Sequence, residues 1–393
     1  MEYKSLGSMV NRKIGYGIVQ PGQSVPDGVP VIKVNNLISG LKSPSELDTT
    51  ARENEAKYSR TRLRGGELIV SVVGTIGKTA IVPKSFAGCN LVRATALIDI
   101  ENELMSKWVK YYFDSPCGQS YIEQNLNTTV QPTLNIKSLV EMPIPLRNTT
   151  EMEKIVLLLS SLDEKIEVNR QINDNLEQQA QSYFQELFVD NADSEWTIGT
   201  ISDLGTVVGG STPSKAKPEY YTESGIAWIT PKDLSINKSK FVSHGENDIT
   251  ELGLKNSSAA IMPEGTVLFS SRAPIGYIAI AAGEVTTNQG FKSVVPKPEI
   301  GTPFVYFFLK NTLTVIEGMA SGSTFKEVSG STMKNVPAVI PDAETLAKFS
   351  DFCAPIFAQQ RILEEQNQSL AKLRDSLLPK LMSGEIDVSA VQL

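Results

Sequence analysis

The sequence predicts an α+β chain in which two similar, mainly β domains each lead into a long helix. Three observations support this fold class. The second half of the 393-residue chain repeats the first, short β-branched and aromatic runs open each half, and a long apolar repeat closes each half. We expect four segments: a globular domain over residues 1–148, a central helix over 149–190, a second domain over 191–341, and a distal helix with the C-terminal tail over 342–393.

The internal duplication organises the chain. Residues 28–37 match residues 225–234, which lie 197 positions later, and residues 66–70 match 265–269 at a spacing of 199. Met142-Pro143 matches Val336-Pro337 at a spacing of 194. The spacing drifts by only a few residues, as expected when two repeats differ by short loop insertions.

The two globular domains are predicted to be small, irregular and rich in short strands. Runs of β-branched and aromatic residues are broken by Gly, Pro, Asn and Asp. We expect strands at 31–34, 68–73, 80–82 and 94–98 in the first domain and at 226–230, 266–270, 278–281 and 292–295 in the second. A helix is predicted to follow in each copy, at 107–114 and 303–313.

Each half ends in a helical pattern with apolar residues at steps of four and three. A seam of this kind on one helix alone is usually packed on a core, but its recurrence in both halves favours an intramolecular antiparallel coiled coil. Asn173 and Asn367 hold equivalent seam positions, and such residues fix register. A helix of about 35 residues spans roughly 50 Å, somewhat more than one turn of B-DNA at about 34–36 Å. The predicted interface residues are Ile155, Leu159, Leu162, Ile166, Asn173, Leu176, Ile356, Leu363, Asn367, Leu370, Leu377 and Leu381.

The charge distribution permits a nucleic-acid partner without requiring one. The net charge of −7 opposes binding to phosphates on average. The excess acid lies mainly in residues 151–194 and 342–393, whereas basic residues exceed acidic ones by four in residues 1–150. The sequence contains neither a secretory signal pattern nor an apolar run long enough to span a membrane, which predicts a cytoplasmic protein.

No residue pattern predicts a catalytic centre or a metal site. Residues 74–79 end like a phosphate-binding loop, but Val72 replaces its first glycine and Tyr277 replaces Lys78 in the second copy, so we interpret them as a β turn. A nucleotide site around Gly77 and Lys78 is the alternative. The single histidine, His244, is predicted to lie on the surface.

Two other groups of residues receive structural interpretations. Asp342 and Glu344 stand at the start of a predicted helix. We interpret them as acidic residues that complement the helix dipole and not as part of a nuclease site. Cys89, Cys117 and Cys353 lack metal-ligand spacing, and we expect all three to be buried small apolar residues. We therefore predict that the chain is not an enzyme.

The whole chain resembles the specificity subunit of type I restriction-modification systems. The segments that carry the resemblance are residues 359–362, 370–385, 271–276 and 287–290, with looser counterparts at 90–92 and 184–188 in the first copy. The resemblance implies that each globular domain is a target recognition domain that reads one half of a split, asymmetric sequence in double-stranded DNA. It also implies that the helices set the spacer and dock two modification subunits.

The resemblance places all chemistry in the partner subunits. The modification subunits would bring S-adenosylmethionine and methylate adenine, and restriction subunits would add cleavage driven by ATP with Mg²⁺. This chain would need no cofactor of its own. A protein scaffold that carries two β domains on a coiled coil and does not bind DNA is the alternative function.

Candidate DNA-contacting residues are polar or basic and fall in the predicted loops. The run from Arg52 through Lys57 and Tyr58 to Arg64 is the densest in basic residues, although a solvated loop explains it equally well. Asn, Lys and Asp side chains at equivalent places in the two copies are able to read base edges. The candidates are Lys33, Asn35, Asn36, Arg60, Arg62, Arg64, Lys78, Thr129, Gln131, Lys232, Asp233, Arg272, Thr324 and Lys326.

Overall fold

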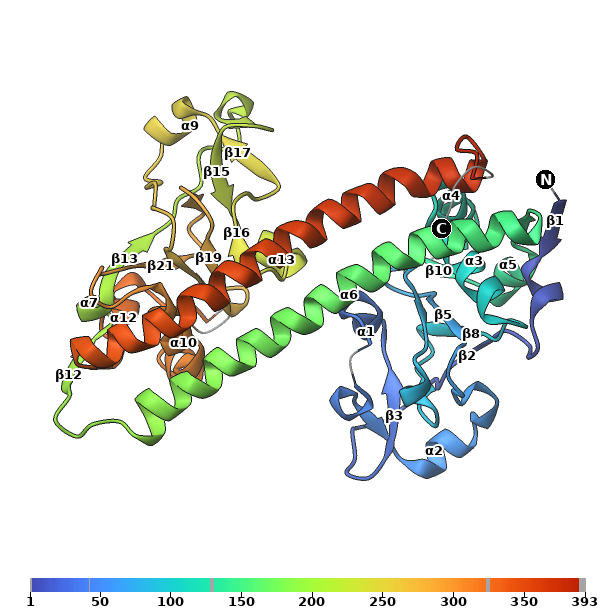
Figure 1. The fold of residues 1–393 in the computed structure, drawn as a ribbon, viewed down its shortest axis with the longest axis horizontal. Helices are drawn as coiled ribbons and strands as arrows, with labels where there is room; N and C mark the ends of the chain where they lie inside the picture. The colour runs from blue at the N-terminus through green and yellow to red at the C-terminus, as the bar shows by residue number, and fades with distance from the viewer. Residues whose placement is uncertain (1, 42, 128–130, 323–325, 389–393) are drawn as a thin grey trace. The chain divides into compact units, whose positions relative to one another are not determined.

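The computed structural model describes residues 2–41, 43–127, 131–322 and 326–388 (Figure 1). The chain divides into two compact units: unit 1 comprises Met1–Lys165 with Ser369–Leu393, and unit 2 comprises Ile166–Gln368. Two long helices, α6 (Thr149–Gln185) and α13 (Ala343–Ser383), each contribute to both units. Each unit therefore combines one globular domain with one part of a helix from each half of the sequence.

Unit 1 contains two main sheets. The larger has the order β2 (Gly15–Tyr16), β8 (Thr95–Ile98), β5 (Leu68–Ser71) and β6 (Thr79–Ile81), with antiparallel neighbours. The smaller has the order β4 (Thr49–Thr50), β3 (Val29–Ile32) and β7 (Asn90–Leu91), and β3 runs parallel to β7. Two short helices, α1 (Val34–Ser39) and α2 (Arg52–Ala56), follow β3 and β4.

Unit 2 repeats this topology. Its larger sheet has the order β13 (Gly205–Gly209), β21 (Lys292–Pro296), β18 (Val267–Ser271), β19 (Ile275–Ala281) and β16 (Phe241–Val242). Its smaller sheet has the order β14 (Tyr221–Thr222), β17 (Asn247–Ile249), β15 (Ile226–Ile229) and β20 (Thr286–Thr287), and β15 runs parallel to β20. The predicted duplication is thus present in the strand order of both sheets.

A two-stranded ribbon precedes each long helix, and the sequence patterns did not reveal its first strand. β1 (Glu2–Ser5) pairs with β11 (Pro143–Leu146), and β12 (Thr197–Thr200) pairs with β22 (Pro337–Ile340). Most side chains of β1 and β12 are exposed, so their sequences lack the alternation of buried and exposed positions that marks a strand. In unit 1 the ribbon brings the start of the domain beside the segment that enters α6.

The remaining elements of the described chain are short helices and one small strand pair. Unit 1 adds α3 (Glu103–Asp114), α4 (Pro116–Gln124), β9 (Leu126–Asn127), β10 (Thr133–Leu134) and α5 (Ile136–Glu141). Unit 2 adds α7 (Ile201–Leu204), α8 (Pro231–Ile236), α9 (Glu251–Lys255), α10 (Thr302–Asn311), α11 (Leu313–Gly318) and α12 (Gly330–Lys334). The predicted helices at 107–114 and 303–313 correspond to α3 and α10.

Residues 74–79 form a β turn, as predicted. The Ser71 hydroxyl donates a hydrogen bond to the Thr75 carbonyl oxygen (2.6 Å) and accepts one from the Lys78 amide (2.8 Å). In unit 2 the Ser270 hydroxyl donates to the Pro274 carbonyl oxygen and accepts from the Tyr277 amide in the same way. Gly74 and Gly77 have φ angles of 79° and 82°. Glycine adopts such positive φ angles readily, so the turn itself accounts for both glycines and no phosphate ligand is needed to explain them.

A second duplicated contact involves Gly17 and Gly210. A Cβ atom on Gly17 would overlap the carbonyl oxygen of Leu91, and one on Gly210 would overlap that of Asn288. The next residue in each case donates a backbone hydrogen bond to the end of a short strand, from Ile18 to Leu91 (2.7 Å) and from Ser211 to Thr287 (2.9 Å). Glycine is needed at both places because the crossing backbone approaches too closely for a side chain.

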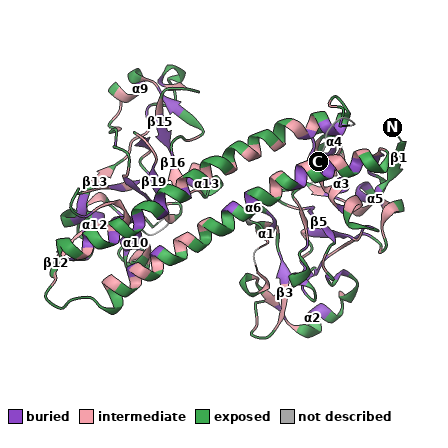
Figure 2. Cartoon of the chain, viewed as in Figure 1, coloured by how far each residue is buried: buried purple, intermediate pink, exposed green. Residues whose placement is uncertain are grey.

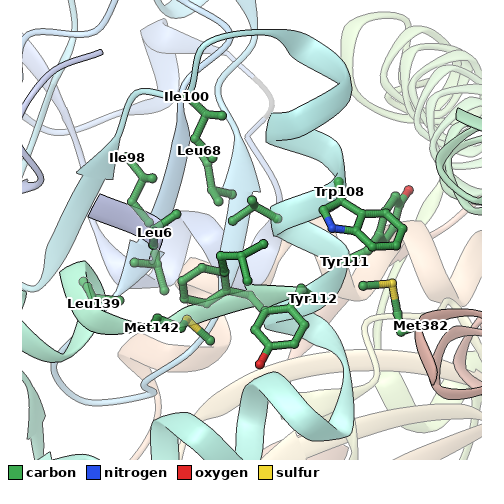
Figure 3. Close-up of a cluster of buried hydrophobic side chains, with 14 of the residues drawn as sticks. Leu6, Leu68, Ile98, Ile100, Trp108, Tyr111, Tyr112, Leu139, Met142 and Met382 are labelled. Carbon is green, nitrogen blue, oxygen red and sulfur yellow. The ribbon is translucent and has the colours of Figure 1, made fainter. Parts of the chain in front are cut away.

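The core of unit 1 joins the globular domain to both long helices (Figure 3). Trp108 and Tyr111 of α3 pack in one apolar cluster with Ile155 of α6 and Met382 of α13. The Trp108 indole donates a hydrogen bond to the Pro145 carbonyl oxygen (2.8 Å), as buried indoles usually need a partner. The long helices are therefore part of the domain core.

Unit 2 has an aromatic core built in the same way. Phe307 of α10 lies 5.9 Å, between ring centroids, from Phe184 of α6 and 6.0 Å from Phe349 of α13. Phe307 and Phe349 have no accessible surface, and Phe184 is almost fully buried. A separate apolar cluster that includes Ile229 and Phe291 fills the space between the two sheets. The same three-helix arrangement thus anchors each domain to its helices.

The predicted helix seam is buried, but the seam is shared with a third helix. All twelve predicted interface residues are buried or half-buried, and Figure 2 shows buried positions recurring along α6 and α13. Within unit 2 the Asn169 side-chain amide donates to the side-chain oxygen of Asn367 (2.9 Å), and the Gln360 side-chain amide donates to the backbone carbonyl oxygen of Asn173 (3.1 Å). Since 169 meets 367 and 173 meets 360, the helices are antiparallel there. A two-helix seam leaves apolar surface exposed, and α3 and α10 cover it.

Charged side chains link α6, α13 and α3 within unit 1. Asp163 of α6 accepts hydrogen bonds from Arg374 of α13 and from the Tyr111 hydroxyl of α3, both at 2.8 Å. Lys110 lies 3.6 Å from Asp163 and 2.9 Å from Asp114. Burial acts to raise the pKa of Asp163, but Lys110 and Arg374 together lower it below its ordinary value.

A different set of charges occupies the corresponding region of unit 2. Glu177 of α6 forms ion pairs with Lys240, next to β16, and with Lys310 of α10. Lys240 is 8% exposed, and its ammonium group also donates to the Gln360 side chain of α13 (2.7 Å). Tyr306 donates to Glu177 at 3.1 Å. Burial acts to raise the pKa of Glu177, but the two lysines lower it overall.

The structure corrects one prediction about the cysteines. Cys89 and Cys353 are buried as expected, and burial raises the pKa of the Cys353 thiol to about 12. Cys117 is exposed, because it lies near the start of α4 on the side of that helix that faces away from the core. His244 is exposed, as predicted. None of the helices in the described segments is long and apolar enough to cross a bilayer.

We expect Glu177→Gln to lower the free energy of unfolding of unit 2 by about 2–3 kcal/mol near pH 7, because it removes the ion pair of the buried Lys240. Since folding lowers the pKa of Glu177 from an ordinary value of 4.5, its contribution is present above pH 4.5 and is lost as the pH falls further. Urea unfolding followed by circular dichroism from pH 7 to pH 3 measures both effects.

The exposed Glu167 on the same helix provides the control, because its polar contacts within the described residues are with Arg170 and Gln171 of its own helix. Glu167→Gln should leave stability at pH 7 within about 0.5 kcal/mol of the wild type. Equal effects of the two substitutions would show that the Glu177 cluster does not hold unit 2 together.

Candidate nucleic-acid interface

A hollow of about 460 Å³ lies in unit 2, beside the ends of strands from both of its sheets. Its wall is formed by the end of β15, the start of α8 and the turns that follow β13, β18 and β20. Three of the predicted DNA-contacting residues line it, namely Lys232, Asp233 and Arg272. Its other lining residues are Thr212, Lys215, Trp228, Thr230, Pro231, Glu246, Asn247, Ala273, Asn288, Gln289 and Gly290.

The base of the hollow is shaped by the first turn of α8. The Asp233 carboxylate accepts hydrogen bonds from the amides of Thr230 (2.7 Å) and Glu246 (2.9 Å). In unit 1 the Asn36 side chain accepts from the Lys33 amide (2.7 Å) at the equivalent turn of α1. Asp233 and Asn36 thus cap equivalent helices in both domains. This local role explains their matching positions, and base contact by either residue stays a prediction.

The hollow carries positive charge at its rim. Lys232 pairs with Glu246 at 2.6 Å, which raises the pKa of Lys232 through a hydrogen bond, and Arg272 lies 3.4 Å from Glu327. Lys215 is exposed and has no ion-pair partner among the residues that the structure describes. A hollow with one uncompensated ammonium group and two paired cations, of which Lys232 is exposed and Arg272 half-buried, suits an anionic ligand.

Neutral hydrogen-bonding groups complete the lining. The Gln289 side-chain oxygen accepts a hydrogen bond from the Thr212 hydroxyl. The Asn288 side chain accepts one from the Gly290 amide (2.8 Å), which fixes the turn. The Trp228 indole donates to the Ser211 carbonyl oxygen (3.0 Å) and is almost fully buried. Amide side chains on a fixed turn beside cations are the combination that reads base edges next to phosphates.

In unit 1 the predicted basic run is held rigidly by a buried carboxylate. Arg62 donates two hydrogen bonds to Glu55, at 2.8 and 2.5 Å, and Glu55 is only 2% exposed. The hydrogen bond from Arg62 lowers the pKa of Glu55. Glu55 also accepts from the Asn90 side chain (3.0 Å) at β7. Arg62 therefore fixes the position of the segment that carries Arg60 and Arg64.

Arg60 and Arg64, on either side of Arg62, are exposed. Arg12 donates hydrogen bonds to the backbone carbonyl oxygens of Arg60 (3.4 Å) and Arg62 (3.0 Å), which holds the backbone of this segment in place. The Arg64 amide donates to Glu67 (2.7 Å). Neither guanidinium has an ion-pair partner within the described parts of the chain, so both are available to an anionic partner.

The remaining predicted residues occupy separate places. Lys33 pairs with Asp48 at 2.6 Å. Lys78 is exposed at the turn between β5 and β6. The side chains of Asn35, Gln131 and Lys326 are also exposed. Thr129 and Thr324 lie outside the described residues. The structure thus brings together Lys232 and Asp233 of α8 with Arg272, which follows β18, but does not join all candidates into one surface.

Sequence reasoning missed several residues that the fold places at equivalent turns. β3 pairs with β7 and β15 with β20 in the same parallel register, so the turn with Arg93 corresponds to the turn with Gln289. Both side chains are exposed on turns whose backbone is fixed by hydrogen bonds. Residues 287–290 stood out as a motif, but nothing in the sequence showed that Gln289, Asn247 and Lys215 meet at one hollow.

No group of three or more His, Cys, Asp or Glu side chains in the described segments is arranged to hold a metal ion. The polar groups of the hollow are amides, hydroxyls, cations and the carboxylates of Asp233 and Glu246.

Comparisons with curated proteins find type I restriction enzyme specificity subunits. The chain is 41% identical over 192 residues to the MjaIX specificity subunit of Methanocaldococcus jannaschii, a match that covers 46% of this chain and 44% of that protein. It is 24% identical over 339 residues to the HindI specificity subunit of Haemophilus influenzae, covering 67% of this chain and 73% of that protein. The match to the MjaIX subunit therefore spans less than half of that relative's length.

The fold matches a solved structure over almost the whole chain. The crystal structure of the type I restriction-modification S subunit from M. genitalium aligns with a TM-score of 0.56 at 18% identity, covering 97% of this chain and 95% of that one. At this identity the likeness concerns the fold alone. The family model described as "Type I restriction modification DNA specificity domain" matches residues 1–178 and again residues 193–372. Because both halves of the sequence match that model, the chain belongs to the type I restriction-modification DNA specificity family.

Proposed function

We propose that this chain is the sequence-reading subunit of a type I restriction-modification complex. The domains at 1–148 and 191–341 would each read one half of a bipartite, asymmetric site in double-stranded DNA. The observation that carries the proposal is the cation-rimmed hollow of unit 2, in a duplicated chain of the specificity family. The two domains differ in side chains at equivalent turns, with Arg93 in one and Gln289 in the other, so their half-sites would differ.

Local charge supports DNA binding despite the acidic composition. Phosphate contacts need Lys and Arg at the surface that faces the duplex, whatever the net charge elsewhere. Arg60 and Arg64 in unit 1 and Lys215 in unit 2 are exposed and without ion-pair partners among described residues. The excess of acidic over basic residues lies mainly in residues 151–194 and 342–393, outside most of the two globular domains. Cations of the globular domains would therefore meet the duplex while these acidic segments face other partners.

The long helices would dock the catalytic subunits. Leu157 and Val168 on α6 and Ile362 and Leu373 on α13 are about half exposed despite being apolar, which suits a protein partner. Two methyltransferase subunits would bring S-adenosylmethionine and methylate adenine, and restriction subunits would use ATP and Mg²⁺. The chain itself would need no cofactor, and its DNA partner would place it in the cytoplasm.

We expect cells that carry this chain with its modification partner to methylate one split, adenine-containing motif. Exchanging residues 1–148 for the corresponding domain of another family member should change one half of the motif and preserve the other, because each domain reads its half independently. Single-molecule sequencing of the genomic DNA maps the motif. A purified complex that shows no preference for any DNA sequence would favour the protein-scaffold alternative.

We expect the helices to set the spacer between the half-sites. Inserting seven residues after Lys165 and seven after Gln368 preserves the seam register and lengthens both helices by about 10 Å. This should add roughly three base pairs to the spacer and leave both half-sites unchanged. The same methylation mapping applies, with a seven-residue insertion in the exposed segment 191–195 as the control. An unchanged spacer after helix insertion would contradict a ruler function.

We expect Lys215→Ala to weaken DNA binding similarly for all sequences, because an ammonium group at the rim contacts phosphate rather than a base. The slope of log affinity against log salt should fall in magnitude by about 1. Fluorescence anisotropy of the assembled complex at several salt concentrations measures it. Lys348→Ala, which removes an exposed lysine from α13, is the matched control and should leave the slope unchanged. If both variants keep the wild-type slope, Lys215 does not touch the DNA.

A further inference from the structure

Each unit completes its cluster of charged residues with one residue from the opposite half of the sequence. In unit 1 the globular domain and α6 supply Lys110, Asp114 and Asp163, whereas α13 supplies Arg374. In unit 2 the second half of the chain supplies Lys240 and Lys310, whereas α6 supplies Glu177. Each half of the sequence therefore supplies one charged residue to the cluster that the other half builds.

The duplication shows what each half has at the position it receives from the other. The helices correspond at a spacing of 194 residues, so Arg374 of α13 corresponds to Ala180 of α6, and Glu177 of α6 corresponds to Ala371 of α13. Ala180 is fully buried in the aromatic core of unit 2, and Ala371 is half-buried in unit 1. Neither half carries the charge that its own domain needs.

A first half paired with a second copy of itself would have Ala180 in place of Arg374. Asp163 and Asp114 would then share Lys110 as their only cation, and the Arg374 hydrogen bond of 2.8 Å to Asp163 would be lost. Asp163 is about a quarter exposed, so water would compensate it only in part. Ala180 would also leave unfilled the space that the Arg374 side chain occupies.

A self-paired second half would be disfavoured more strongly. With Ala371 in place of Glu177, Lys240 and Lys310 would lose their shared carboxylate. The side chain of Lys240 is only 6% exposed and is surrounded by the rings of Phe357, at 4.0 Å, and Tyr306, at 4.7 Å. The nearby carboxylate of Glu364 accepts hydrogen bonds from the backbone amides of Lys240 and Phe241. A buried ammonium group without its ion pair is a severe penalty on association.

We propose that the two halves of this chain are built to pair with each other and to reject a second copy of themselves. The exchanged residues Arg374 and Glu177 make the mixed pair the one arrangement that satisfies both clusters. The pairing itself is independent of DNA. Its consequence rests on the proposed function: only a mixed pair carries two different reading domains, so the subunit would be committed to an asymmetric site.

The test uses the whole chain with a protease site placed in the exposed segment 191–195. After cleavage both halves are unfolded in urea, refolded together and counted by native mass spectrometry. Without selection, self-pairs and mixed pairs would form in statistical proportions. We expect mixed pairs to outnumber self-pairs at least tenfold, whereas pairing without selection gives equal numbers of the two, and self-pairs as numerous as mixed pairs would overturn the proposal. Counting the pairs formed when both halves are co-expressed covers a failure to refold.

Two substitutions supply the missing charge and should reverse the preference. Ala180→Arg gives the first half the cation that Asp163 lacks in a self-pair, and Ala371→Glu gives the second half the carboxylate that Lys240 lacks. Each should raise the corresponding self-pair to at least its statistical share. Gln178→Arg and Lys372→Glu introduce the same side chains at exposed neighbouring positions and should leave self-pairs rare. Equal results for variants and controls would show that the exchanged charges do not select the partner. Because no DNA is involved, such a failure would leave the proposed reading function standing.

Discussion

Helices from opposite halves of the sequence meet within each unit, and the remainder of the structure depends on that contact. α3 and α10 each pack on two long helices, and neither domain would have a complete apolar core without them. Apolar burial supplies the driving force, and the charged clusters around Asp163 and Glu177 decide which residues meet. Because buried charges are costly without partners, these clusters contribute more to choosing the arrangement than to its stability. The globular domains can then vary on their outer turns without loss of the core.

The sequence predicted those features that recur at a fixed spacing or with a clear period. The duplication, the main strands, α3, α10 and the two long helices follow from patterns that burial imposes on apolar residues. β1 and β12 escaped prediction because they lie exposed on two-stranded ribbons. The packing of α3 and α10 on the seams was not predicted, because a heptad pattern shows that a helix face is buried but does not show which element covers it. The prediction that Cys117 is buried was wrong for a related reason, because one small residue contributes little to an apolar periodicity.

The candidate interface was predictable in its location but less so in its individual residues. Lys232, Asp233 and Arg272 meet at one hollow, as their loops allowed. Asp233 and Asn36, however, bond to backbone amides, and Arg62 bonds to the buried Glu55. Polar residue types suited to base recognition are the same types that cap helices and neutralise buried acids. Only tertiary contacts separate these roles, and they direct attention to side chains such as Lys215, Arg93 and Gln289.

The proposed reading of two different half-sites would explain why one chain carries two related domains. The central claim is that each domain contacts its own stretch of DNA while the helices hold the spacing between them. Hydroxyl-radical footprinting of DNA that carries the mapped motif, bound by this chain with its modification partner, tests the claim most directly. The account predicts two protected segments separated by accessible spacer sugars. A single continuous footprint over one domain's half-site, with no protection of the other, would contradict it.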